Sequence, residues 1–125
     1  MIFGRVNAFR EAIVTLVLRS AEGQDQNIEA VVDTGFNGHL TLPPDVVAAL
    51  GLPFRRSGRA LLGDGRAVTF DVHEAVILWG GSPLRIPVDV ADTDPLMGMG
   101  LLYGHSLSIH IIENGEVTVR ALPVS

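Results

Sequence analysis

The pattern of apolar and polar positions predicts a chain of short strands joined by tight turns. Residues 12–19, Ala-Ile-Val-Thr-Leu-Val-Leu-Arg, are rich in β-branched side chains, and residues 28–32 form a second apolar run after the polar segment 21–27. Runs of this length, bounded by turn residues, are typical of β-strands. They predict a first hairpin whose second strand leads directly into residues 33–35, Asp-Thr-Gly.

A short helix is predicted after the apolar run 39–42. The segment 43–45, Pro-Pro-Asp, favours a helix start because proline suits the first turn and a carboxylate suits the N-terminus. The helix is expected to run through Leu50, with Gly51 as its stop and Pro53 preventing its continuation.

The second half of the chain predicts three further hairpins. Strand-like residues 59–79 are interrupted at 63–65, Gly-Asp-Gly, which favours a type I′ turn, and 80–83 form another turn. Residues 84–90 alternate with period two, and Pro87 places them at a sheet edge or a break in the ladder. Asn-Gly at 114–115 predicts a hairpin between strands 106–112 and 116–122.

Eight or nine short strands and two short helical pieces predict an all-β fold, most simply a small closed barrel. A chain of 125 residues fits one domain, residues 1–125, and no internal repeat appears. The hydrophobic fraction of 47% is high beside a charged fraction of 18%, with a mean hydropathy of +0.35. Part of this apolar surface is therefore expected in a subunit interface.

Charge and residue usage exclude several classes of protein. The net charge is −5, and the nine basic residues are all Arg and scattered except at 55–59, so no nucleic-acid partner is expected and that cluster is interpreted as a solvated strand edge. No apolar run is long enough to cross a bilayer and no secretory leader is evident, so no membrane partner and a cytoplasmic location are expected. The absence of Cys and Lys excludes disulfides, thiolate nucleophiles and Schiff-base chemistry.

No metal or organic cofactor is expected. The four histidines lack metal-ligand or triad spacing, and Asp92 and Asp94 are interpreted as a solvated turn. Gly98-Met99-Gly100 does not complete a dinucleotide-binding motif, and no crossover helices surround it. Only His39 lies close enough to the Asp-Thr-Gly segment to influence its charge.

The candidate catalytic residues are Asp33, Thr34 and Gly35. An acidic side chain between two strands, with glycines that allow the backbone to turn, is held in one position. This triplet after an apolar strand resembles the catalytic motif of aspartic proteases, specifically the small stand-alone, retropepsin-like type found in bacteria. The resemblance covers roughly residues 12–120.

Two further elements lie where that family would have them. The hairpin tip Gly63-Asp64-Gly65 resembles the flap that closes over a substrate, although an ordinary hairpin would look the same and no aromatic residue lies at the tip. Leu96-Met97-Gly98 resembles the hydrophobic-hydrophobic-glycine element that runs beside the active-site loop and leads into a helix. The resemblance thus implies substrate-binding roles for these two elements and for Phe36, which stands where many members have a small residue.

The resemblance implies an endopeptidase that works as a symmetric homodimer. Acid-protease chemistry needs two carboxylates, and Asp-Thr-Gly occurs once, so one Asp33 from each subunit would form the dyad. By resemblance, the Gly35 N–H would orient the carboxylate and the Thr34 hydroxyl would join the two loops. The partners expected are a second copy and a peptide or protein substrate.

Two alternatives remain open. A retropepsin-like dimer with a distorted dyad could be catalytically inactive and act as a peptide- or protein-binding module. An unrelated β-barrel could contain Asp-Thr-Gly by chance, because Asp and Gly are common turn residues. The oligomeric state distinguishes the second alternative, since both retropepsin-like interpretations require a dimer.

Overall fold

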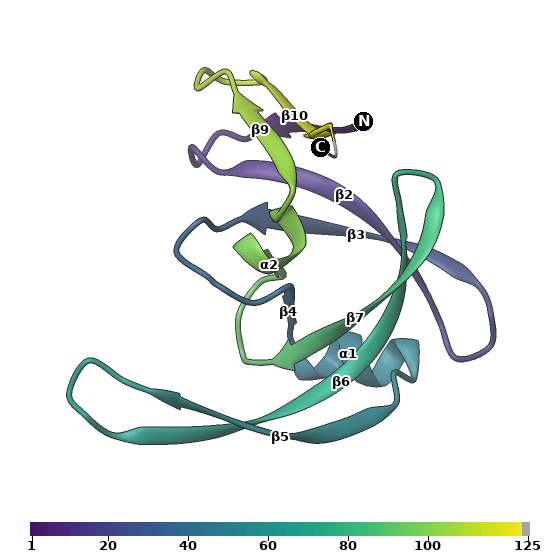
Figure 1. The fold of residues 1–125 in the computed structure, drawn as a ribbon, viewed down its shortest axis with the longest axis vertical. Coiled ribbons are helices and arrows are strands. Elements are labelled where there is room, and N and C mark those ends of the chain that lie inside the picture. The colour runs from purple at the N-terminus through teal and green to yellow at the C-terminus, as the bar shows by residue number, and fades with distance from the viewer. Residues whose placement is uncertain (124–125) are drawn as a thin grey trace.

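The computed structural model describes residues 1–123, and over this range the chain forms ten strands and two helices (Figure 1). The fold is therefore mostly β, as the sequence predicts. The strands are β1 (Ile2–Val6), β2 (Ala12–Arg19), β3 (Asp25–Val32), β4 (Leu40–Leu42), β5 (Phe54–Leu61), β6 (Ala67–Trp79), β7 (Ser82–Val90), β8 (Leu96–Met97), β9 (His105–Ile109) and β10 (Glu116–Ala121). The helices are α1 (Pro44–Leu50) and α2 (Met99–Leu102).

All ten strands belong to one sheet with the order β5-β6-β7-β4-β8-β3-β2-β1-β10-β9. An additional pairing joins β6 to β2, so the pairings of β2, β3, β8, β4, β7 and β6 run in a ring. The β5–β6 hairpin extends from the body of the molecule at the lower left of Figure 1. The ends of the described chain lie side by side because β1 pairs with both β2 and β10.

The core lies inside this curved sheet, and α1 and α2 contribute to it. Its largest fully buried side chains come from β2, β4, β6, β7, β8, β10 and α1, so elements from distant parts of the chain share one continuous core. They include Val14, Leu18, Leu40, Leu42, Leu50, Ile77, Ile86, Val88, Met97, Val117 and Val119.

Helix α1 lies where the sequence predicts it, and the residues predicted to start and end it do so. It begins at Pro44 with Asp45 in its first turn, and it ends at Gly51, which adopts a left-handed conformation with φ of 64°. The Gly51 and Leu52 N–H groups return to the carbonyls of the last turn, which satisfies acceptors that the helix cannot use itself. Buried Val47 and Leu50 attach the helix to the core.

The hairpin at 63–65 is confirmed, but the prediction of its turn type was wrong. Only Gly65 has a positive φ, of 86°, and Asp64 does not, whereas a type I′ turn needs two such residues. The pair that satisfies this requirement is Gly80-Gly81, with φ of 59° and 87°, between β6 and β7. Asp64 instead accepts hydrogen bonds from the Arg66 backbone and guanidinium, which stabilise the three-residue loop.

The last hairpin is also confirmed, with a longer connection than predicted. Strand β9 ends at Ile109 instead of residue 112, and residues 110–115 link it to β10. Asn114 takes the left-handed conformation, with φ of 60°, and its N–H donates to the Val6 carbonyl at 2.9 Å. The longer link therefore connects the hairpin to the end of β1.

The edge position predicted from Pro87 is confirmed. Strand β4 pairs with β7 only over Val88–Val90, so β7 has β6 as its single neighbour at Pro87. Among residues 1–123, no helix has both the length and the apolar character needed to cross a bilayer.

Candidate active site

Asp33 lies immediately after β3, at the point where that strand runs parallel to β8. Its backbone N–H donates to the Met97 carbonyl at 2.9 Å, which continues the ladder one residue beyond the strand. The Gly35 N–H donates to Asp33 Oδ1 at 2.9 Å, and the Phe36 N–H donates to the Asp33 carbonyl at 3.2 Å. Both the backbone and the half-buried carboxylate of Asp33 are therefore held by main-chain donors and acceptors.

The loop after Asp33 is hydrogen-bonded to the start of α2. Three backbone hydrogen bonds cross between the two segments, from the N–H groups of Gly98, Met99 and Gly100 to carbonyls of residues 36–39, at 3.0, 2.7 and 2.9 Å. A Cβ on Gly98 would lie 2.7 Å from the Phe36 carbonyl oxygen and closer still to the Gly38 carbonyl oxygen. Only glycine leaves room for this approach of the two backbones.

Phe36 packs into the space left by two glycines. Its ring lies against Gly38 and Gly98, because a Cβ on either residue would come within 2.6 Å of ring carbons. The side chain is half-buried. A bulky aromatic residue directly after Asp-Thr-Gly is therefore accommodated by glycines further along the chain, while part of the ring stays accessible.

The Leu96-Met97-Gly98 element lies beside the loop, as the sequence suggested. Met97 is fully buried in the core and Gly98 is buried, so these two residues support the loop from behind. Leu96 is half-buried and lies on the opposite face of β8 from Met97. Of the three, Leu96 alone keeps a side chain that another molecule can reach.

The tip of the β5–β6 hairpin lies away from these residues in the single chain. A Cβ on Gly63 or Gly65 would have no neighbour within 4 Å, and both residues and Asp64 are exposed. Strand β5 has β6 as its only partner among the described strands. The hairpin is therefore an extended arm whose free edge and tip are available to a second molecule.

Comparison with known structures identifies this architecture. A retropepsin-like aspartic protease from Rickettsia conorii matches with a TM-score of 0.57 and 16% sequence identity, over 95% of this chain and 88% of that chain. The chain has a retropepsin-like fold. No family model matches the sequence, and no match is found among curated proteins.

The retropepsin-like fold also brings a second carboxylate, Asp89, close to the Asp33 loop, which the sequence did not predict. A Cβ on Gly38 would lie 3.4 Å from Asp89 Oδ2, so this carboxylate faces the loop. Burial raises the pKa of the half-buried Asp89, while the positive charges of Arg56 and His39 act in the opposite direction. The sequence predicted that His39 lies close to this site, and its charge acts on Asp89.

Strand register explains why Asp89 was missed. In the sequence, Asp89 lies between Val88 and Val90 at a polar position of the alternating segment 84–90. An ordinary solvent-facing strand residue would look the same. In the retropepsin-like fold, β7 pairs in parallel with β4, and Thr41 lies opposite Asp89. A parallel pairing between strands almost fifty residues apart leaves no local signal in the sequence.

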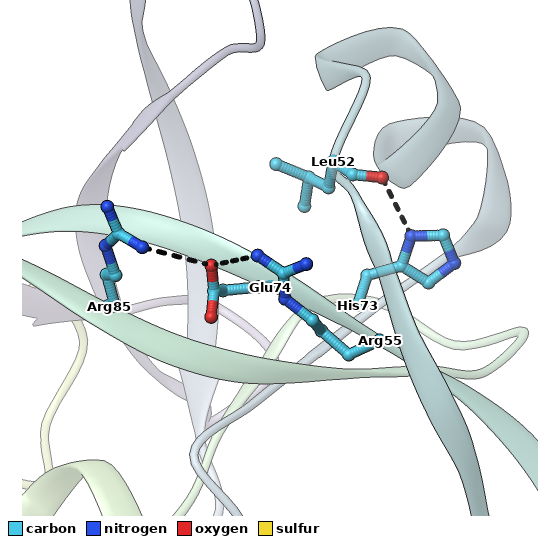
Figure 2. Close-up of polar contacts among 5 residues, drawn as sticks. All are labelled: Leu52, Arg55, His73, Glu74 and Arg85. Carbon is cyan, nitrogen blue, oxygen red and sulfur yellow. Dashed lines mark hydrogen bonds and ion pairs between the residues drawn. The ribbon is translucent and has the colours of Figure 1, made fainter.

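A cluster of charged residues fixes the base of the hairpin arm (Figure 2). Glu74 on β6 pairs with Arg55 at 2.7 Å and with Arg85 at 3.8 Å, and the Arg55 hydrogen bond and charge lower the pKa of Glu74. His73 Nδ1 lies 2.9 Å from the Leu52 carbonyl, between β6 and the segment after α1. Arg55 lies at a β-bulge in β5, and the exposed arginines of this strand agree with the predicted solvated edge.

Proposed function

We propose that this protein is an aspartic endopeptidase whose catalytic dyad contains one Asp33 from each subunit of a symmetric homodimer. The observation that carries the proposal is the Asp33 loop itself, held at both ends by the backbone and with its carboxylate oriented by the Gly35 N–H, within a retropepsin-like fold. Each chain supplies a single Asp-Thr-Gly, so the second carboxylate comes from a second copy.

The surface beside Thr34 supports a dimer. Thr34 is exposed and lines a groove of about 270 Å³ together with Arg10, Val32, Ile109 and Ile111. Ile111, which lines this groove, is 75% exposed, and two more exposed apolar residues are chain neighbours of its lining residues: Phe9, 84% exposed, precedes Arg10, and Ile112, 70% exposed, follows Ile111. Apolar side chains gathered in this way are typical of a protein interface, and a second copy placed there would join its Thr34 to this one.

The proposed reaction follows from the electrostatics of two close carboxylates. As is known for aspartic-protease dyads, such carboxylates cannot both ionise and therefore share one proton. The ionised Asp33 removes a proton from a water molecule as it attacks the peptide carbonyl, and the protonated Asp33 of the partner subunit donates to the carbonyl oxygen. The resulting gem-diol then collapses: the C–N bond breaks, the carboxyl that took the proton from water passes it to the leaving amine, and the other carboxylate takes a proton back from the gem-diol hydroxyl. The dyad thus returns to sharing one proton, and the reaction uses only side chains of the two chains and water.

The substrate in this proposal is a peptide or an unfolded protein segment in extended conformation. It lies between the dyad and the two hairpin arms and gains main-chain hydrogen bonds as an added strand does. Two half-buried apolar side chains lie beside the dyad, those of Phe36 and Leu96. The arm closes over the peptide with its exposed tip, which consists of Gly63, Asp64 and Gly65. We place the enzyme in the cytoplasm.

The test compares wild type with Asp33→Asn on an unfolded protein substrate across about pH 3 to 7, the range in which carboxylates titrate. Asp92→Asn, at an exposed loop position, is the matched control for loss of one carboxylate. We expect cleavage by wild type and Asp92→Asn and none by Asp33→Asn, with all three proteins dimeric in sedimentation.

Three results would contradict the proposal. Cleavage that persists in Asp33→Asn would exclude Asp33 as the catalytic group. A dimeric wild type that cleaves nothing would favour a protein that only binds peptides, and a monomer would remove the basis for the shared dyad.

A further inference from the structure

Asp89 occupies one row of side chains that crosses the sheet beside the Asp33 loop. In the strand register, Leu96 lies opposite Thr41, Thr41 opposite Asp89, Asp89 opposite Val72, and Val72 opposite Arg56. Residues directly opposite each other in a sheet project from the same face. The row therefore runs across one face from β8 to β5.

This face is also the one from which Asp33 projects. Val31 lies opposite Leu96, and Asp33 follows Val31 by two residues along the extended chain, so both side chains leave the same face. Three strand spacings separate Val31 from Asp89, which is about 14 Å. Asp33 lies two residues, about 7 Å, further along the chain than Val31, so Asp33 and Asp89 are at most about 16 Å apart across the curved sheet, or four to five residues of an extended peptide at about 3.3 Å per residue.

The Asp89 carboxylate has no fixed partner in the described chain. Neither hydrogen bonds nor an ion pair contribute to its ionisation, which is influenced only by burial and by the charges of Arg56 and His39. No buried side-chain oxygen in residues 1–123 lacks a hydrogen-bond partner, so the oxygens of Asp89 are open to solvent or to a ligand. A half-buried carboxylate in this state attracts a cation more strongly than an exposed one.

The neighbouring charged groups do not already neutralise Asp89. Arg56 is exposed, and Val72 lies between Arg56 and Asp89 in the strand register; the charge of Arg56 acts on Asp89, but the two form no ion pair among residues 1–123. The other nearby carboxylate on this face, Glu74, is paired with Arg55 and Arg85. Thr41 on β4 carries no charge, and His39 in the loop is the remaining titratable neighbour.

We infer that Asp89 is a specificity-determining residue that selects a Lys or Arg side chain about four residues from the bond to be cleaved. The inference rests on the proposed endopeptidase function, and in the symmetric dimer it applies on both sides of the cleaved bond. The basic side chain of the substrate approaches Asp89 between Gly38 and Val72, where the carboxylate faces the loop. An acidic side chain at the same place is repelled.

The acidity of the medium modulates this selection. Burial raises the pKa of Asp89, so the carboxylate takes up a proton at a higher pH than an exposed aspartate does, although Arg56 and His39 partly oppose this effect. Protonation removes the charge that attracts the substrate cation. The preference for Lys and Arg therefore weakens as the pH falls, while cleavage itself continues.

The experiment is to digest a mixture of peptides of varied sequence and to map every cleaved bond by mass spectrometry. Wild type is compared with Asp89→Asn and with Asp71→Asn, which removes an exposed carboxylate from the neighbouring strand β6. Bonds that are also cleaved by Asp33→Asn are discarded, so that only the dyad contributes. We expect Lys and Arg to be enriched by about fivefold to tenfold three to five residues from the cleaved bond, as one desolvated charge pair would produce.

The expected pattern is enrichment in wild type and in Asp71→Asn and its loss in Asp89→Asn. Equal use of Lys, Gln and Glu at these positions by wild type would overturn the inference while leaving the protease intact, and so would enrichment that persists in Asp89→Asn. Absence of any cleavage that depends on Asp33 would instead refute the proposed function, and the inference with it. The experiment therefore gives different results when the inference about Asp89 is wrong and when the proposed protease function is wrong.

Discussion

Replacing Gly98 by alanine tests how the Asp33 loop is held in place. Gly98 has φ of −103° and ψ of 179°, a conformation that alanine adopts without strain, so backbone preference is not the issue. The added Cβ would lie 2.5 Å from Phe36 Cδ2 and 2.7 Å from the Phe36 carbonyl oxygen. The two backbones must therefore move apart.

The expected cost combines two effects. Overpacking at a closely packed position typically costs about 1 to 3 kcal/mol. Three backbone hydrogen bonds join the segments, and weakening one or two of them costs about 1 kcal/mol each. We therefore expect Gly98→Ala to lower the free energy of unfolding by about 3 kcal/mol, which corresponds to a fall in Tm of about 12 °C for a domain of this size.

The assay is urea unfolding of both proteins at one protein concentration, because dimerisation makes apparent stability depend on concentration. Gly63→Ala is the matched control, since it adds the same methyl group where no atom lies within 4 Å, and it should change stability by less than about 0.5 kcal/mol. The double variant Gly98→Ala/Phe36→Leu should not recover the loss, because the carbonyl oxygens stay in the way. A Gly98→Ala protein as stable as wild type would refute this account of the loop.

Two further predictions concern groups outside the loop. Because the Arg55 hydrogen bond lowers the pKa of Glu74, the ion pair stabilises the fold above the ordinary carboxylate pKa and is lost as the pH falls through the lowered value. Glu74→Gln should therefore be less stable than wild type near neutral pH and indistinguishable in strong acid, as urea titrations at several pH values would show. His105 accepts a hydrogen bond from Trp79 Nε1 at 3.1 Å, so His105→Ala should lose about 1 kcal/mol in thermal unfolding, whereas the exposed control His110→Ala should not. Equal Tm values for these two variants would contradict the role given to that hydrogen bond.

The elements predicted correctly from the sequence are those with local causes. Helix α1 is specified by Pro44, Asp45 and Gly51 within eight residues, and the hairpin at 63–65 by adjacent turn residues. The Asp33 loop could be predicted because an apolar strand, an acid and a glycine follow one another. Each of these signals lies within a few residues of the structure it specifies.

The features that could not be predicted depend on which distant strands become neighbours. The strand β1 had no prediction, because residues 2–6 gain their place from β2 and β10 and not from their own pattern. The position of Asp89 depends on the parallel pairing of β7 with β4. The turn at 63–65 differed from its prediction because the Asp64 side chain accepts a hydrogen bond from the Arg66 N–H and Asp64 does not take a positive φ. Long-range pairing and side-chain competition are therefore the two sources of error.

The position of β1 between β2 and β10 has a consequence for synthesis on the ribosome. Val119 lies opposite Ile2, so the N-terminal strand has a partner on only one side until nearly the whole described chain has emerged. Pairings between residues so far apart in sequence close large loops and slow folding. The sheet is therefore expected to be completed only once β10 has left the ribosome, and the dimer that we propose would assemble after that step.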